Sequence, residues 1–153
     1  MLAQRLLVPL DFSDPSQQAL DYAIELAGKL QASLTLLHVI QPLLMRGGPD
    51  IGADASLVLY LEEIEATMWQ TIETHATRVR AAGLACDALV IHGTPFQQII
   101  DIATAKQVDL IVMGTQGHTG LQRFFLGSVA EKVVRMAPCP VLVTRSPTAT
   151  ETT

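Results

Sequence analysis

Nearly continuous apolar runs alternate with longer amphipathic stretches along most of the chain. Five of these runs are short and rich in aliphatic residues, a pattern typical of strands that are buried on both faces of a sheet. They cover residues 5–11, 33–39, 86–92, 110–113 and 141–145. We therefore predict five strands, with a polar tail after the last one.

Between the strands, apolar residues recur with the period of an amphipathic helix. The four predicted helices cover residues 14–30, 55–82, 95–106 and 129–136. Asp14 followed by Pro15 indicates an N-cap and a first helical residue, and Thr94 with Pro95 repeats that signal. Gly83 is placed to end the second helix. Ser128, three residues before a glutamate, predicts the N-cap of the last helix.

The periodicity also predicts which helical side chains are buried. The second helix carries an apolar stripe made of Leu57, Val58, Leu61, Ile64, Met68, Ile72 and Val79. The last helix carries Val129, Val133, Val134 and Met136 as its apolar positions. Residues 42–54 are rich in glycine and proline, so we predict a loop there.

Strict alternation of strands and helices defines the expected fold class. It predicts an α/β protein with one doubly wound, open sheet of five parallel strands, right-handed crossovers and helices on both faces. The expected strand order is 3-2-1-4-5, in a single domain of residues 1–146 followed by a tail of residues 147–153. In that order the first and fourth strands flank the switch point, where ligands bind beyond the strand ends. Asp11 and Gly114 end these two strands.

The segment after the fourth strand carries the strongest chemical signal. Gly114 and Gly117 open a connection that is long for its kind, and Gly127 and Ser128 lead into a helix. Helix starts present unpaired amides and a partial positive charge, and glycine lets a phosphate come close to the backbone. The segment therefore predicts a polyphosphate site, although plain turns and an ordinary cap explain the same residues about equally well.

Two residues of the first strand are candidates for the same site. Asp11 could accept a hydrogen bond from a ribose hydroxyl or help to place a magnesium ion; the alternative is a role in capping the next helix. Pro9 lies inside a strand that we expect to be central, where proline is disfavoured. We predict a β-bulge at Pro9, beside the ligand.

Composition narrows the function classes. Hydrophobic residues make up 49% and charged residues 16% of the 153 residues, which predicts a well-buried globular domain. The net charge is −5 and there is no basic block, so we expect no nucleic-acid partner. Cys86 and Cys139 stand far apart without metal-ligand spacing, so we expect buried thiols. With no signal peptide or membrane-length run, we predict a cytoplasmic protein without membrane insertion.

The spacing Gly114-x-x-Gly117, nine residues, Gly127-Ser128 resembles a known signature. It is similar to the motif G-2x-G-9x-G-[ST] of the ATP-binding class of the universal stress protein family. The segments VPLDFSD and APCPVLVTR extend the resemblance over residues 6–145. The resemblance implies an adenine nucleotide alpha hydrolase-like fold and ATP as ligand, with Mg²⁺ carried on the ATP phosphates rather than held directly by the protein.

The resemblance also implies which residues contact the nucleotide. Pro9 and Asp11 match nucleoside contacts, and the backbone of Val39 matches a contact to an adenine edge. The remaining matches are Met113, Gly114, Gly117, Gly127, Ser128 and Val129. An apolar edge strand at Val141–Thr144 favours a homodimer in which the same strand of a second copy covers it, and the family implies a dimer as well.

Three functions compete at this point. The first is an ATP-binding regulatory protein of the stress response that acts on an unknown protein partner. The second is a slow ATPase or phosphotransferase, although the pattern G-x-x-x-x-G-K-[ST] and the kinase loop motifs are absent from the sequence. The third is an interaction module that binds AMP or a cyclic nucleotide. We expect weak turnover at most, and no catalytic residue is predicted.

Overall fold

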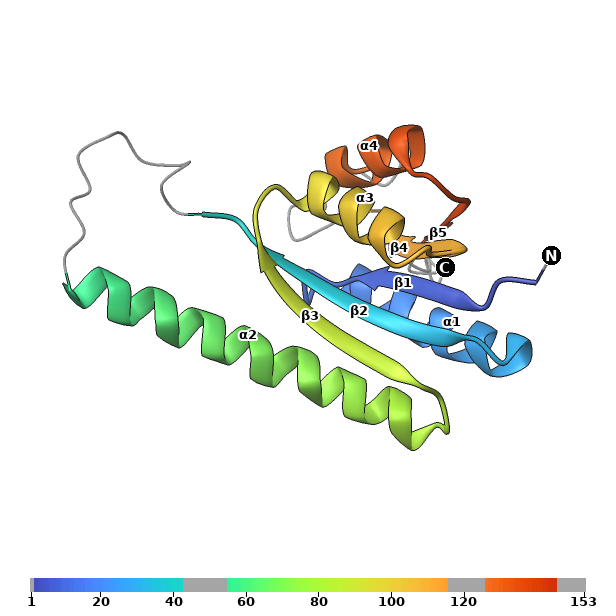
Figure 1. The fold of residues 1–153 in the computed structure, drawn as a ribbon, viewed down its shortest axis with the longest axis horizontal. Coiled ribbons are helices and arrows are strands. Elements are labelled where there is room, and N and C mark those ends of the chain that lie inside the picture. Colours follow the sequence, from blue (N-terminus) through green and yellow to red (C-terminus); the bar gives the residue numbers. More distant parts are fainter. Residues whose placement is uncertain (1, 43–54, 116–125, 146–153) are drawn as a thin grey trace, which may run out of the picture.

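The computed structural model describes residues 2–42, 55–115 and 126–145. These residues form five strands and four helices in strict alternation, with bounds close to those predicted (Figure 1). The strands are β1 (Arg5–Pro9), β2 (Ser33–Ile40), β3 (Cys86–His92), β4 (Leu110–Gly114) and β5 (Val141–Thr144). The helices are α1 (Asp14–Leu30), α2 (Ala55–Ala81), α3 (Pro95–Ala105) and α4 (Ser128–Met136).

All strands are parallel and form one sheet in the order β3-β2-β1-β4-β5. The predicted fold class is thus confirmed. The order reverses direction at β1, so β1 and β4 flank the switch point. In the part of the chain that the structure describes, no helix is long and apolar enough to cross a membrane.

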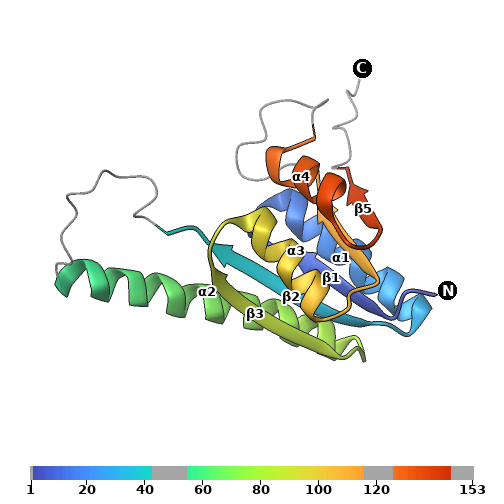
Figure 2. The same ribbon diagram turned by 45° about the horizontal axis from the view of Figure 1, so that its top comes forward.

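The core consists of two layers, one on each face of the sheet (Figures 1 and 2). Leu6 and Val8 of β1 pack with the buried residues of α1 and α2, whereas Leu7 packs on the other face with residues of α3 and α4. Because successive side chains of a strand point to opposite faces, a central strand needs apolar residues at every position. This explains the unbroken apolar run of β1.

The predicted bulge at Pro9 is wrong. The pairing of β1 with β2 runs without interruption from Arg5 opposite Ser33 to Pro9 opposite Leu37. The next amide, that of Leu10, donates to the Leu37 carbonyl at 2.8 Å, so the position of the missing Pro9 N–H faces β4 instead. The described pairs between β1 and β4 end at Leu7, where these strands separate. Proline is tolerated because its amide has no ladder partner to lose.

Two predicted helix caps lie one residue too late in the sequence. Ser13, not Asp14, caps α1, and its hydroxyl accepts from the Ser16 amide at 3.4 Å. Gly127, not Ser128, is the N-cap of α4: its ψ of 157° is not helical, and its amide donates to the Thr115 carbonyl at 2.6 Å. The helix therefore begins at Ser128, and the predicted capping box does not form.

The apolar stripe of α2 is buried over only part of its length. Ile72 and Val79 are buried, but Val58 is 45% exposed. Figure 1 shows the reason: the N-terminal half of α2 extends beyond the sheet, which therefore cannot cover it. On α4, likewise, Val133 is buried while Val134 and Met136 are exposed, because this short helix turns a single narrow face toward the sheet.

Candidate functional site

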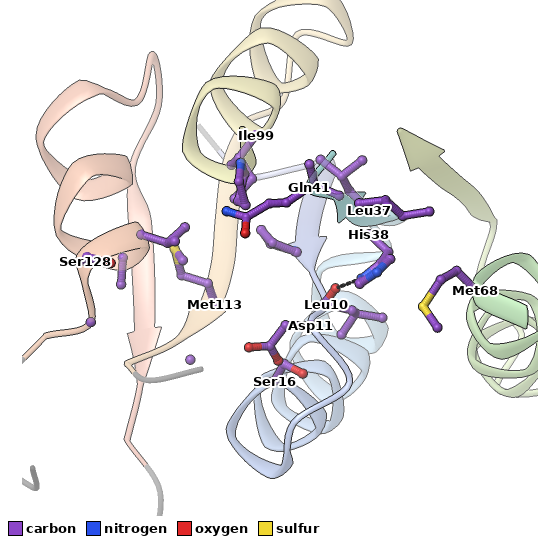
Figure 3. Close-up of a pocket in the computed structure, with 18 of the residues that line it drawn as sticks. Leu10, Asp11, Ser16, Leu37, His38, Gln41, Met68, Ile99, Met113 and Ser128 are labelled. Carbon is purple, nitrogen blue, oxygen red and sulfur yellow. Dashed lines mark hydrogen bonds between the residues drawn. The ribbon is translucent and has the colours of Figure 1, made fainter. Parts of the chain in front are cut away.

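A pocket of about 400 Å³ lies beyond the C-terminal ends of the central strands. It is lined by the ends of β1, β2 and β4, the starts of α3 and α4, and two side chains of α2 (Figure 3). The pocket opens where β1 and β4 separate, because their side-by-side pairing has already ended there. Its position is the one at which doubly wound sheets bind ligands.

The predicted site residues converge on this one pocket. Its lining includes Pro9, Asp11, Val39, Met113, Gly114, Gly127, Ser128 and Val129. Gly117 lies outside the described residues. The structure thus brings together the ends of three strands and the start of α4, although the segments are far apart in the sequence. That these residues contact a nucleotide stays a prediction.

The start of α4 offers the pocket backbone donors that have no acceptor within the helix. Gly127 has no side chain and makes no side-chain cap. The amides of Ser128, Val129 and Ala130 belong to the first helical turn, which lacks intrahelical acceptors, and all three residues line the pocket. By contrast, at the start of α1 the Ser13 hydroxyl accepts from the Ser16 amide. The α4 start is therefore the end of the pocket suited to an anion.

Gly114 has a packing role in addition to the one predicted. A Cβ atom at this position would lie 2.9 Å from the Pro15 carbonyl oxygen and 3.0 Å from the Pro15 carbonyl carbon. The first is shorter than real Cβ contacts and the second is tighter than most of them, and both are to backbone atoms, so the close packing of the α1 start against β4 depends on glycine at position 114. Glycine at the end of β4 is thus required by the fold whether or not a phosphate comes near it.

Asp11 supports the start of α1 and also lines the pocket. Its Oδ1 accepts a hydrogen bond from the Ser13 amide at 2.9 Å and a short one from the Ser13 hydroxyl. Asp11 therefore braces the residue that caps α1, rather than capping the helix itself. The half-buried carboxylate also lines the pocket. Among the lining residues that the structure describes, it is the one aspartate, and there is no glutamate, lysine or arginine.

A stack of three rings lies behind the pocket and was not predicted. Phe12 stacks on His38, with ring centroids 4.5 Å apart, and on His75 of α2, at 5.8 Å. Phe12 adopts a left-handed backbone conformation, with φ of 63°, which is uncommon outside glycine. The His38 Nδ1 lies 2.7 Å from the Leu10 carbonyl, so this nitrogen carries the proton. No local sequence pattern predicts such a stack, because its three residues come from distant segments.

Ile64 and Met68 are pocket residues that sequence analysis assigned to the core. Both are half-buried and line the pocket from α2. Helical periodicity identified the correct face of α2 but could not show that this face passes from the sheet to a cavity.

The described residues give no indication of a metal site or of an activated thiol. Within the three described segments, no group of three or more histidine, cysteine or acidic side chains is placed to hold a metal ion. Both cysteines are free thiols. Burial raises the pKa of Cys86 to about 11 and also raises the pKa of Cys139. Neither thiol is therefore activated as a nucleophile.

The fold and the pocket together define a class: doubly wound α/β proteins with a small-molecule pocket at the switch point and an uncapped helix start within it. Within that class, the chain belongs to the universal stress protein family, whose model matches residues 3–145.

Individual relatives agree with this assignment. The chain is 34% identical to universal stress protein MJ0531 of Methanocaldococcus jannaschii, over 95% of this chain and 84% of the relative. The solved structure of protein MJ0577 from the same organism has a TM-score of 0.85 at 26% identity and covers 97% of this chain and 100% of its own. A universal stress protein solved in complex with cAMP has a TM-score of 0.70 at 23% identity, covering 95% and 98%.

Proposed function

We propose that this protein binds ATP in the pocket at the switch point, with Mg²⁺ carried on the phosphates, and that it acts as a nucleotide-dependent regulator in the stress response. The observation that carries the proposal is the uncapped start of α4, which faces the same pocket as Asp11 and the ends of β1, β2 and β4. This arrangement offers separate surroundings for phosphates, ribose and base.

The phosphates are assigned to the α4 start. Amides of Ser128 and Val129 supply donors, and the helix dipole adds a partial positive charge. The described lining contains neither lysine nor arginine, so the backbone has to provide the attraction. Mg²⁺ on the phosphates would reduce the negative charge that these amides must hold near Asp11.

The nucleoside is assigned to the strand ends. Asp11 can accept a hydrogen bond from a ribose hydroxyl, and the backbone of Val39 at the end of β2 can pair with an adenine edge. The pocket volume of about 400 Å³ falls within the range of about 300–1,000 Å³ that is usual for small-molecule sites. A nucleotide therefore fits both the size and the distribution of polar groups.

The test compares ATP binding by the wild-type protein with two variants of the α4 cap. In Gly127→Asp, a carboxylate at the N-cap competes for the amides and repels phosphate, so ATP affinity falls at least tenfold, about 1.4 kcal/mol. The same carboxylate stabilises the fold by about 0.3–1 kcal/mol, since it complements the helix dipole. Gly127→Asn offers a cap of the same shape without charge, and its loss of affinity is smaller.

Isothermal titration calorimetry with MgATP, AMP and cAMP distinguishes between the three candidate functions. Tighter binding of MgATP than of AMP or cAMP supports the proposal, whereas the opposite order supports the interaction module. Steady release of ADP during the titration identifies a slow ATPase. The proposal fails if the nucleotide-free wild-type protein does not bind MgATP, or if Gly127→Asp binds it as tightly as the wild type.

We further propose that two copies pair through β5. This strand is at the edge of the sheet, next to β4, and its four residues are half-buried in one copy. An apolar edge strand with open hydrogen-bonding groups is prone to pairing. Pairing with β5 of a second copy would satisfy these groups and keep the two pockets separate.

A further inference from the structure

The pocket reaches across the sheet edge to α2, which packs on the opposite face from α4. Ile64 and Met68 lie one helical turn apart on α2, and both line the pocket. In Figure 3, Ser128 and Met68 are at opposite ends of the labelled residues, with Asp11, Leu10 and His38 between them. The α2 end is therefore separate from the helix start that suits an anion.

The chemistry of the α2 end differs from that of the α4 end. From α2 it receives the thioether of Met68 and the aliphatic group of Ile64, and in Figure 3 the ring of His38 is the labelled side chain next to Met68. The two α2 side chains offer a phosphate no hydrogen-bond donor. Thioether groups form favourable contacts with aromatic rings. A flat heteroaromatic base is thus the ligand part that this end fits.

Met68 is held in place from both directions along α2. On one side, Glu65 pairs with His92 at the end of β3, with 3.1 Å between Oε2 and Nε2. On the other side, Ile72 is completely buried in the core. Met68 itself packs against the core cluster that contains Ile72, so it forms a preformed wall, which needs little rearrangement on binding.

We propose that Met68, supported by Ile64, contacts the nucleobase and makes the site selective for a nucleoside polyphosphate over free polyphosphate. This inference rests on the proposed function, since it divides the same pocket into a phosphate end and a base end. It adds α2, a helix outside the glycine-rich segment, as the element that recognises the base.

The experiment measures the binding of MgATP, adenosine and magnesium tripolyphosphate to the wild type and to Met68→Ala, Met68→Leu and Gln70→Ala. Met68→Ala should weaken MgATP and adenosine by about three- to tenfold, the scale of a lost thioether–ring contact. Tripolyphosphate binding should change less than twofold. Met68→Leu restores most of the bulk and most of the affinity, and Gln70→Ala, on the exposed side of the same helix, leaves all three ligands unaffected.

The outcomes separate this inference from the proposal beneath it. If the wild type does not bind MgATP, both fail. If it binds MgATP but Met68→Ala binds it equally well, only the inference fails. Equal weakening of MgATP and tripolyphosphate by Met68→Ala also overturns the inference, since it indicates general damage to the pocket. Circular dichroism of each variant verifies that the helices are intact.

Discussion

At the scale of single residues, the lack of a side chain at Gly114 allows β4 and α1 to pack closely together. Its backbone approaches Pro15 so closely that a Cβ would lie 2.9 Å from the Pro15 carbonyl oxygen. That oxygen belongs to the first turn of a helix, which cannot move without disturbing the pocket wall at Asp11. The end of β4 and the start of α1 therefore pack at a distance that leaves no room for a side chain at position 114.

The first prediction compares two glycine-to-alanine substitutions. Gly114→Ala should lower the free energy of unfolding by about 1–3 kcal/mol, the usual cost of forcing an extra methyl group into a packed site. Gly28→Ala is the matched control: this glycine lies in α1 with nothing within 4 Å of its Cβ position. Alanine there should raise stability by about 0.5–1 kcal/mol because it favours the helix. Urea denaturation measures both, and equal effects would refute the packing argument.

His75 provides a second residue-scale prediction, on pH. Burial lowers the pKa of His75, and the positive charge of Arg78 lowers it further. The unfolded chain, with a histidine pKa of about 6.5, therefore binds the proton more readily than the folded protein. The stabilising contribution is fully present above about pH 6.5 and is lost as the pH falls toward the folded pKa.

Denaturant unfolding of the wild type and His75→Gln between about pH 8 and about pH 5 tests this. The wild type should lose more stability than the variant below about pH 6.5, and the two curves should run parallel at higher pH. A steeper loss in the variant would show that another group dominates the acid response.

At the scale of elements, β5 forms backbone hydrogen bonds on the side that faces β4. The carbonyls of Pro140 and Thr144 accept from amides of β4 and of Thr115, so the even-numbered residues of β5 face β4. In a parallel pair the intervening residues, Val141 and Val143, direct their backbone groups away from the sheet. These outward groups are the ones available to a second copy.

Two proline variants separate the two sides of β5. Val143→Pro removes an outward amide and should convert a dimer to a monomer while the sheet stays intact. Leu142→Pro removes an amide that faces β4, so it should destabilise the fold itself by about 3 kcal/mol or more, as expected for proline within a ladder. Light scattering gives the oligomeric state and thermal unfolding the stability. A wild type that is monomeric at high concentration, or a dimeric Val143→Pro, contradicts the β5 interface.

At the scale of the whole molecule, the pocket joins elements from both halves of the chain. β1 and β2 come from the first half, β4 and α4 from the second, and α2 lies between them. A ligand that contacts all of them stabilises their common arrangement, because it binds the folded chain and not the unfolded one.

Thermal unfolding with added nucleotide tests this coupling. At MgATP concentrations about a hundredfold above the Kd, stability should increase by about 2.7 kcal/mol, which corresponds to a rise in Tm of roughly 5–10 °C for a chain of this size. Gly127→Asp should unfold at the same or a slightly higher temperature without ligand, since its carboxylate complements the helix dipole, but it should lose most of the increase. An increase of the same size in Gly127→Asp would place the ligand elsewhere.

The sequence by itself determined the element order, the sheet topology and the edge of the sheet where the candidate site lies. These follow from local periodicity and from chain connectivity: buried parallel strands must be apolar on both faces, and crossovers are right-handed. Eight of the lining residues followed too, because strand ends in such a sheet meet at one edge.

Only the tertiary structure decided the rest. Gly127 rather than Ser128 caps α4 because of a bond to Thr115, and Pro9 needs no bulge because β4 has already diverged from β1. Ile64 and Met68 line the pocket, Met68 while also packing against the core, and Val58 is exposed, because α2 is longer than the face of the sheet it covers. Each of these depends on where distant segments end relative to one another, which periodicity along the chain does not encode.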